Sequence, residues 1–121
     1  MKVAVSAQHN DIESLVDPRF GRAAWFIIVD SESGEWTAID NRQTAGSSGG
    51  AGVQSGTLVV DQGVQSVITG NVGPNAHKVL AAAGISVYQA GNGITVREAI
   101  RSLNAQELEA VAAPTVAGHW S

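Results

Sequence analysis

Runs of strand length alternate with helix-length segments along most of this chain, and Gly-rich loops separate them. Apolar and β-branched runs predict five strands, at residues 2–7, 24–30, 35–40, 65–69 and 85–88. Apolar residues at helical spacing predict three helices, at residues 53–62, 74–83 and 96–103. The order is β-β-β-α-β-α-β-α, and right-handed crossovers make the first, fourth and fifth strands parallel. The pattern predicts an α/β fold with a mixed five-stranded sheet and helices on both faces.

The second and third predicted strands differ in their expected burial. Ala24–Asp30 is a continuous apolar run with aromatic and β-branched residues, which is typical of a strand buried on both faces. Residues 31–34 form a turn cluster, and residues 35–40 then alternate apolar with polar side chains. Together they predict a hairpin whose second strand is half exposed.

Local signals mark where the later helices begin. Pro74 suits the first turn of the second helix because that position needs no N–H donor. Thr95 and Glu98 have the spacing of a capping box at the start of the third helix. Asn104 and Glu107 have the same spacing and predict a last short helix.

Length and composition limit the possible classes of protein. The 121 residues predict one domain, at residues 1–112, followed by a loosely ordered tail at 113–121. The absence of Cys excludes disulfides, thiolate zinc sites and Cys-ligated iron–sulfur clusters. No apolar run approaches the ~20 residues of a membrane-spanning helix, and the first residues lack a signal pattern, so we expect a cytoplasmic protein. The formal net charge of -4 disfavours general nucleic-acid binding.

The strand directions bring four loops to one rim of the sheet, which we call the carboxyl rim. The first, fourth and fifth strands end there, and so does the third, because the second strand runs antiparallel to both its neighbours. Loops at residues 8–23, 41–52, 70–75 and 89–95 therefore converge, whereas the turn at 31–34 lies at the opposite rim. Ligands of open α/β sheets bind outside the carboxyl ends of the strands. We expect the binding site at the carboxyl rim.

Three predicted helices begin at the carboxyl rim, near Gly52, Pro74 and Val96. Each helix start offers unpaired N–H groups and the positive end of a helix dipole. Gly-rich loops that lead into helix starts are suited to binding anions. The helix starts therefore predict an anion site.

Basic residues are concentrated at the same rim. Arg19, Arg22 and Arg42 lie on the converging loops, and Lys78 lies one turn into the second helix. An anion site explains this placement. The alternative is that the arginines cap helices and pair with acidic residues of the same region, namely Asp11, Asp17 and Asp40.

Motifs for catalysis are absent. Gly46–Gly52 is not followed by Gly-Lys-Ser/Thr, which excludes a Walker phosphate loop, and no Gly-x-Ser-x-Gly elbow occurs. The strands 2–7 and 65–69 carry no carboxylate for the metal ions of a nuclease. His9, His77 and His119 do not form a metal-ligand pattern, although His9 and His77 can both reach the rim. The sequence predicts no catalytic residues, and we do not expect an enzyme.

Several segments together resemble one known family. They are Met1–Val5, Asp17–Ala23, the Gly-rich loop before Val53, Val67–Ala76, Ala83–Tyr88 and the capping box at Thr95. Over residues 1–103 the chain resembles the nitrogenase iron–molybdenum cofactor biosynthesis accessory family. The resemblance implies a ribonuclease-H-like, three-layer α/β fold without nuclease chemistry. It also implies binding or carriage of metal–sulfur clusters or cofactor precursors.

The resemblance implies a particular cargo as well. Many members of the family use Cys or His in the loop that corresponds to residues 41–52, where this chain has Ser47, Ser48 and Gly49. That difference argues against covalent iron–sulfur ligation. Small members without Cys imply a molybdenum–copper sulfide cluster held non-covalently. Such a cluster carries its own sulfide and needs N–H donors, guanidinium groups and apolar surface from the protein.

These requirements select the candidate cofactor-binding residues. Arginine side chains neutralise charge, loop and helix-start amides point at cluster sulfurs, and apolar side chains shield the cluster from water. The candidates are Arg19, Phe20, Arg22, Arg42, Ser48, Gly49, Gly50, Gly52, Asn71, Val72, Gly73, Asn75, His77 and Ile94. No residue is predicted to ligate a metal directly.

Three alternatives remain open. In the first alternative, the cargo is an iron–molybdenum cofactor precursor or an iron–sulfur species. In the second, the protein is a regulator whose rim binds a partner protein, such as an ATPase. The third is a degenerate enzyme of the nuclease fold, which the missing strand carboxylates disfavour. Nothing in the sequence requires more than a monomer.

Overall fold

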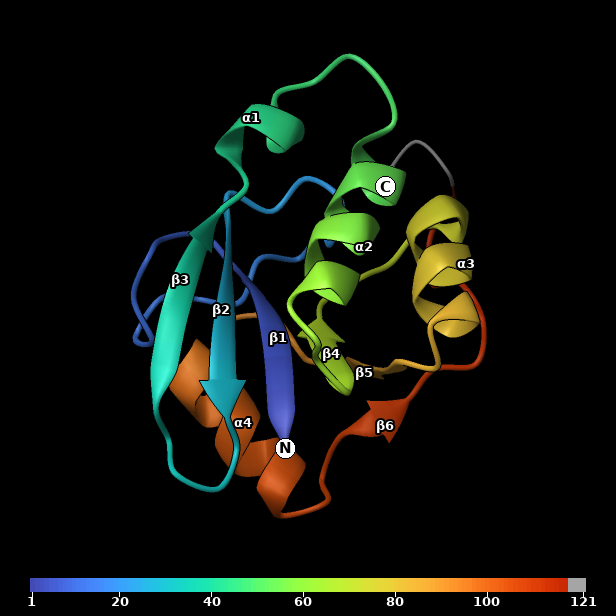
Figure 1. The fold of residues 1–121 in the computed structure, drawn as a ribbon. Helices are drawn as coiled ribbons and strands as arrows, with labels where there is room; N and C mark the ends of the chain where they lie inside the picture. The colour runs from blue at the N-terminus through green and yellow to red at the C-terminus, as the bar shows by residue number, and fades with distance from the viewer. Residues whose placement is uncertain (118–121) are drawn as a thin grey trace.

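The computed structural model describes residues 1–117, which form a single six-stranded sheet flanked by helices (Figure 1). The strands are β1 (Lys2–Ala7), β2 (Trp25–Asp30), β3 (Trp36–Asp40), β4 (Ser66–Thr69), β5 (Ser86–Gln89) and β6 (Glu109–Ala110). The helices are α1 (Arg42–Ala45), α2 (Ala51–Asp61), α3 (Pro74–Ala82) and α4 (Val96–Asn104). The bounds of β1 to β5 and of α2 to α4 lie within two residues of those predicted. Within residues 1–117, no helix is long and apolar enough to cross a membrane.

The strand order is β3-β2-β1-β4-β5-β6. β1 pairs antiparallel with β2 and parallel with β4, and β5 extends the sheet parallel to β4. β2 and β3 form the predicted antiparallel hairpin. The mixed sheet and the convergence of loops at the carboxyl rim are therefore confirmed.

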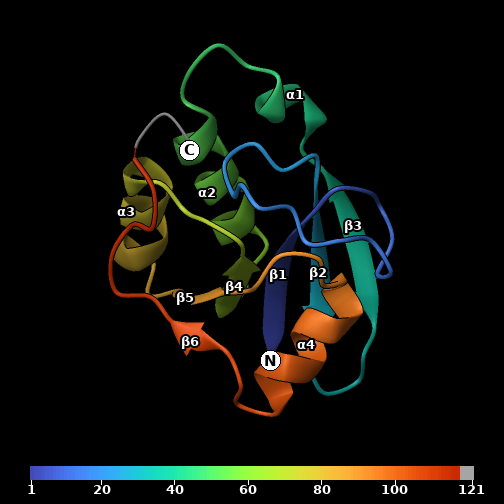
Figure 2. The same cartoon turned by 180° about the vertical axis from the view of Figure 1, so that it is seen from behind.

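Two hydrophobic clusters occupy the two faces of the sheet, and alternation along β2 shows why. Phe26 and Ile28 belong to the cluster beneath α2 and α3, whereas Ile27 and Val29 belong to the cluster beneath α4. The four residues are all buried, as the continuous apolar run predicted. Figure 1 shows α2 and α3 in front of the sheet, and Figure 2, seen from behind, shows α4 in front of it. The chain therefore has three layers, with helices on both faces.

The predicted count of five strands is wrong, and so is the predicted last short helix. Gln106 adopts the left-handed conformation (φ 60°) after α4 and turns the chain away from the helix axis. The side chain of Asn104 donates to the carbonyl of Ser31 (2.9 Å), so it does not cap a new helix. The chain instead runs extended as β6 and pairs antiparallel with β5.

Two further segments differ from prediction. The Gly-rich loop at 41–52 contains the short helix α1. In the predicted tail, Thr115 is fixed to the residues before α3: its N–H donates to the carbonyl of Val72, and its hydroxyl accepts from the Val72 N–H (both 2.9 Å). Part of the predicted tail is thus held against the domain, while its last residues, His119 among them, lie outside the described part of the chain.

Candidate functional site

The loop at residues 17–24 crosses the carboxyl rim between the ends of the strands and the helices. The carboxylate of Asp17 accepts a hydrogen bond from the N–H of Arg19 (2.9 Å), which closes the Pro18 turn. The N–H of Phe20 donates to the carbonyl of Asn71 (3.0 Å). The sequence Asp-Pro-Arg-Phe-Gly-Arg therefore forms a tight loop joined to the segment that leads into α3.

Two contacts fix the depth of this loop. Phe20 is fully buried and packs its ring 5.0 Å from that of Phe26. Gly70 approaches the loop so closely that a Cβ there would lie 2.6 Å from the Cα of Pro18. Burial raises the pKa of Asp17, and the N–H groups of Arg19 and Ala24 oppose that rise in part.

A buried hydrogen-bond network joins the 17–24 loop to α2 and to the end of β3. The hydroxyl of Ser55 donates to the carbonyl of Gly21 (2.7 Å). The side-chain amide of Asn41 donates to that hydroxyl (3.0 Å) and to the carbonyl of Ala23 (2.9 Å). Asn41 and Ser55 are both buried. These hydrogen bonds hold three segments distant in sequence in one arrangement, while the side-chain oxygen of Asn41 is buried without a partner among residues 1–117.

Arg22 holds the Gly-rich loop in place. Its guanidinium donates to the carbonyls of Ala45 (3.0 Å) and Ser47 (2.9 Å) at the end of α1. Arg22 is half-buried. The sequence predicted that this arginine neutralises a bound anion, whereas in the structure its Nη1 group donates to two backbone carbonyls.

Arg42 lies away from the other predicted residues. It forms a two-pronged ion pair with Asp40 (2.8 and 3.0 Å) and stacks 4.9 Å over the ring of Trp25. The hydrogen bonds from Arg42 lower the pKa of Asp40 to about 2. The alternative interpretation of the arginines, pairing with acidic neighbours, therefore holds for Arg42.

The N-termini of α2 and α3 have no side-chain caps among residues 1–117. The residue before α2 is Gly50, in the left-handed conformation (φ 75°), and the residue before α3 is Gly73. Within residues 1–117, no acceptor is found for the N–H groups of the first helical turns, which are those of Ala51, Gly52, Val53, Asn75 and Ala76. The two helices lie side by side in both views, and Gly56 allows α2 to approach Val79 of α3. Two positive helix ends therefore open at the same rim and on the same face.

The N-terminus of α4 is closed, contrary to the prediction that all three helix starts offer free N–H groups. The capping box is confirmed: the Thr95 hydroxyl accepts from Glu98 N–H (3.1 Å), and the Glu98 carboxylate accepts from Thr95 N–H (2.9 Å). The next two N–H groups donate to carbonyls of the 8–17 loop, those of Ser14 (2.8 Å) and Ile12 (3.0 Å). Ile94 lies on this closed side of the sheet, packed against the cluster beneath α4.

The other predicted residues fall into three groups. Arg19 forms an isolated bridge with Asn71, and its side chain is exposed near the start of α3. Ser48, Gly49, Gly50 and Asn75 are exposed, and Asn71 and His77 are half-buried. Gly52, Val72 and Gly73 are buried, as is Phe20, so the apolar residues Phe20 and Val72 form the base of this region rather than its surface.

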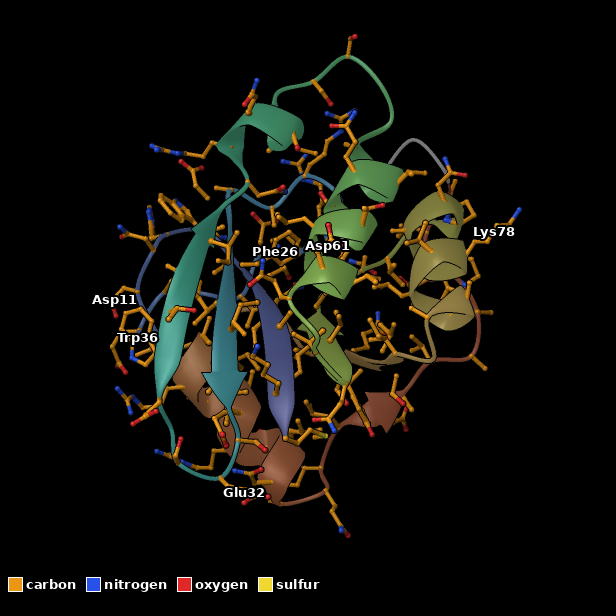
Figure 3. All side chains as sticks on the ribbon, in the orientation of Figure 1. Asp11, Phe26, Glu32, Trp36, Asp61 and Lys78 are labelled. Carbon is orange, nitrogen blue, oxygen red and sulfur yellow. The ribbon has the colours of Figure 1, made fainter. Side chains whose placement is uncertain are left out.

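Lys78 does not join the site, although it is exposed. Figure 3 shows its side chain on the outer side of α3, pointing away from α2. Among the candidate cations, Arg19 is therefore the exposed one whose backbone lies beside the segment that leads into α3.

Sequence reasoning missed the residues that hold the loops together. Asn41, Ser55 and Thr115 each connect segments more than ten residues apart, and nothing in their local sequence signals a partner. The buried polar side chain of Ser55 on the inner face of a predicted helix is the one available sign, because buried hydroxyls are normally hydrogen-bonded.

An open depression of about 590 Å³ lies on the other side of Asn71, beneath the ends of β4 and β5. Its lining includes the carboxylates Glu107 and Glu109. An anion is disfavoured beside those carboxylates, so the α2–α3 side of the rim suits an anion better. Residues 1–117 contain no group of three His, Cys, Asp or Glu side chains that could hold a bare metal ion.

Comparisons with known proteins identify the family and similar folds. The family model of the dinitrogenase iron-molybdenum cofactor matches residues 1–106. The apo form of the orange protein from Desulfovibrio gigas has a TM-score of 0.91 and 37% identity, over 95% of this chain and 96% of that one. A Thermotoga protein proposed to be a NifB protein has a TM-score of 0.83 and 36% identity, over 95% and 97% of the two chains. An uncharacterized protein from Methanocaldococcus jannaschii is 33% identical over 111 residues, 90% of each chain. The match to the family model over nearly the whole described chain shows that this protein belongs to the dinitrogenase iron-molybdenum cofactor family.

Proposed function

We propose that this protein binds a preassembled, anionic metal–sulfide cluster non-covalently at the carboxyl rim, and that the cluster is a molybdenum–copper sulfide. The surface we assign to it consists of the uncapped starts of α2 and α3, the exposed loop residues 48–50 and the side chain of Arg19. We call this surface the α2–α3 rim site. The cluster is cargo, and the proposed role is binding rather than catalysis.

The observation that carries the proposal is the pair of open helix ends in a chain without Cys. The first-turn N–H groups of α2 and α3, which find no acceptor within residues 1–117, lie on one face of the sheet at the ends of helices whose dipoles add at that rim. A negatively charged ligand supplies the missing acceptors. Membership of a family named for an iron-molybdenum cofactor supports a cluster that contains molybdenum, and the absence of Cys favours the molybdenum–copper sulfide that the family resemblance implies for such small members.

The donor set fits a cluster that brings its own sulfide. The chain has no thiolate to bridge metals, and within residues 1–117 no cluster of metal-ligating side chains occurs. Backbone N–H groups and a guanidinium are instead donors to sulfide and positive charge for a polyanion. These residues would hold the cluster, orient it and exclude some of its water, while the cluster's own bonds keep it assembled.

Reconstitution tests the proposal. The purified protein is incubated with tetrathiomolybdate and Cu(I), passed through a gel-filtration column, and examined for a visible charge-transfer absorption with stoichiometric molybdenum and copper. We expect the chromophore to elute with the protein. Elution of all colour and metal with the small molecules would refute the molybdenum–copper assignment. A parallel trial with iron and sulfide tests the iron-containing alternatives.

A pair of arginine variants locates the site. Arg19→Ala removes the exposed guanidinium near α3, and Arg42→Ala removes a guanidinium already paired with Asp40. We expect Arg19→Ala to weaken cluster retention severalfold and Arg42→Ala to leave it unchanged, because a partnered charge contributes little to a distant anion. Equal losses in both variants would place the cluster elsewhere.

The absence of catalysis is also open to test. The sheet core offers no carboxylate for a metal-dependent nuclease, since the buried polar side chains at the ends of β1 and β4 are Ser6 and Thr69, which hydrogen-bond to each other (2.8 Å). Incubation of pure protein with single- and double-stranded nucleic acid and Mg²⁺ or Mn²⁺ is expected to leave the substrates intact. Cleavage that follows the protein peak would revive the enzyme alternative.

A further inference from the structure

Asn92 and Gly93 form an exposed turn in the loop that runs from β5 to the start of α4 (Figure 2). Gly93 is in the left-handed conformation (φ 79°). A Cβ built on Gly93, or on the preceding Gly91, would meet nothing within 4 Å. The turn therefore has free space around its backbone on both sides of Asn92.

The groups of this turn that can react with each other have no partners in the described part of the chain. Within residues 1–117, no acceptor is found for the backbone N–H of Gly93, and the side-chain amide of Asn92 forms no hydrogen bond. Gly93 has no side chain to obstruct an approach to its nitrogen. The nitrogen of Gly93 can therefore reach Cγ of Asn92, and a bond between these two atoms closes a five-membered ring.

The other asparagines of residues 1–117 lack this combination. At three of them the next backbone N–H already donates to an acceptor in the fold, at 2.9, 2.9 and 3.0 Å: Asn41, Asn71 and Asn104. Asn75 is fixed in the helical backbone at the start of α3. Asn10 is exposed, but a residue with a side chain follows it, whereas Asn92 is followed by Gly. Asn92 is therefore the asparagine at which ring closure meets the least obstruction.

We propose that Asn92 is a site of spontaneous covalent modification, at which the side-chain amide is lost through a cyclic imide. The backbone nitrogen of Gly93 forms a bond to Cγ of Asn92, the bond from Cγ to Nδ2 breaks, and the Gly93 N–H proton leaves with Nδ2 as ammonia. Water then breaks one of the two ring C–N bonds. Cleavage at Cγ gives aspartate, and cleavage at the backbone carbonyl carbon gives isoaspartate, in which the main chain runs through the former side chain.

The isoaspartyl product would loosen the closed start of α4. It adds one methylene group to the backbone shortly before the capping residue Thr95. The path of the chain matters there, because the carbonyl of Ile94 accepts a hydrogen bond from the N–H of Val16 (2.9 Å). Either product also adds a carboxylate to the depression beneath β4 and β5, which Asn92 lines together with two glutamates.

Ageing of the folded protein tests the proposal. The purified protein is held at mildly alkaline pH and physiological temperature, and peptide mass spectrometry follows every asparagine over several weeks. We expect conversion at Asn92 at least about tenfold faster than at Asn10, because a glycine obstructs ring closure least. A carboxyl methyltransferase specific for isoaspartate should label the same peptide. The modified protein should separate on an anion-exchange column, with one more negative charge than the formal net charge of -4.

Two variants identify the cause of the reaction. Asn92→Gln keeps an exposed amide but would require a larger ring, so the modification should stop while the melting temperature stays unchanged. Asp11→Gly places a glycine after the exposed Asn10 and should raise conversion there severalfold. Equal conversion at Asn10 and Asn92 in the wild type, continued modification of the same peptide in Asn92→Gln, or no acceleration at Asn10 in Asp11→Gly would each overturn the proposal.

Two further measurements test what the fold contributes. The urea-unfolded protein is aged in parallel, and we expect Asn92 to convert in the folded protein at a similar rate, because its turn is not held by hydrogen bonds. An intact Asn92 in folded protein, when the unfolded protein has converted, would overturn the proposal. In the isolated isoaspartyl fraction, amide hydrogen exchange at residues 95–97 should be faster than in the unmodified protein. Unchanged exchange there would overturn the predicted loosening of α4.

Discussion

The helices on the two sides of the sheet begin in opposite ways, although all three follow loops at the same rim. On one side, α4 has its first N–H groups bonded by a capping box and by carbonyls of the 8–17 loop. On the other side, α2 and α3 begin after glycines and have no side-chain cap. The closed start contributes to stability, and the open starts leave donors available for a ligand. The difference teaches that a helix start at a carboxyl rim indicates a binding site only where nothing else in the fold uses its N–H groups.

The largest expected effect comes from Gly70→Ala, which disturbs the open side. The added Cβ would lie 2.6 Å from the Cα of Pro18, so the 17–24 loop must shift away from β4. We expect a loss of about 2–3 kcal/mol in the free energy of unfolding, measured by urea denaturation, because such overpacking is not relieved by rotating a flexible side chain. Gly49→Ala is the control, since its Cβ would meet nothing within 4 Å. Equal stability of the two variants would show that the loop is not fixed by its contact with Gly70.

A smaller effect is expected on the closed side from Thr95→Ala. Loss of the hydroxyl leaves the N–H of Glu98 without its acceptor, which costs about 1 kcal/mol. Cluster retention in the reconstitution assay should be unchanged, since α4 is not part of the α2–α3 rim site. A fall in cluster retention larger than the loss of folded protein explains would contradict the distinction between the open side, at α2 and α3, and the closed side, at α4.

Arg22→Met should have the reverse effect, with a small change in stability and a larger change in cluster retention. The substitution keeps most of the apolar stem but removes the donors to Ala45 and Ser47. The freed carbonyls are near solvent, so we expect less than about 1 kcal/mol of destabilisation. Cluster retention should fall severalfold, because the Gly-rich loop before α2 loses its anchor. Faster amide hydrogen exchange confined to residues 45–50 would identify that cause, and unchanged exchange would contradict it.

The smallest effect is expected on the pKa of Asp40, the last residue of β3. Arg42 lowers the Asp40 pKa from 3.8 to about 2. A carboxyl with a lowered folded pKa contributes stability above its unfolded pKa and loses it as pH falls. The stabilising pair should therefore weaken between about pH 4 and pH 2. NMR titration should place the Asp40 midpoint near 2 in the wild type and clearly higher in Arg42→Met, though still below 3.8 because the backbone N–H of residue 42 continues to donate to the carboxylate. Cluster retention at neutral pH should be unchanged in the variant. A midpoint unaffected by the substitution would mean that Arg42 is not the cause.

Local sequence signals correctly predicted most of the helices and strands and the rim of the sheet at which the loops converge. The capping box at Thr95 and the Pro at the start of α3 occur as expected, because both depend on a few neighbouring residues. Strand directions followed from the connections, and they placed the converging loops correctly. β6 was missed because a two-residue strand has no periodicity, and Gln106 in the left-handed conformation is not a typical turn residue.

The site residues were harder to predict because their partners are distant in sequence. Arg19, Arg22 and Arg42 are equivalent in a list of rim cations, but tertiary contacts engage Arg22 with two carbonyls and Arg42 with Asp40. The start of α4 likewise loses its free donors to Ser14 and Ile12, which lie some eighty residues earlier in the chain. Periodicity and spacing describe one segment at a time, so they cannot show which donors another segment uses.

The two margins of the sheet are unequal, and this limits how the protein can assemble. β3 pairs with β2 along five residues, whereas β6 has two residues in the described part of the chain. A chain added at β3 would therefore find no comparable surface at the β6 margin of a neighbouring molecule. Head-to-tail growth into fibres needs two complementary margins on each copy, so the unequal margins of this sheet disfavour such growth.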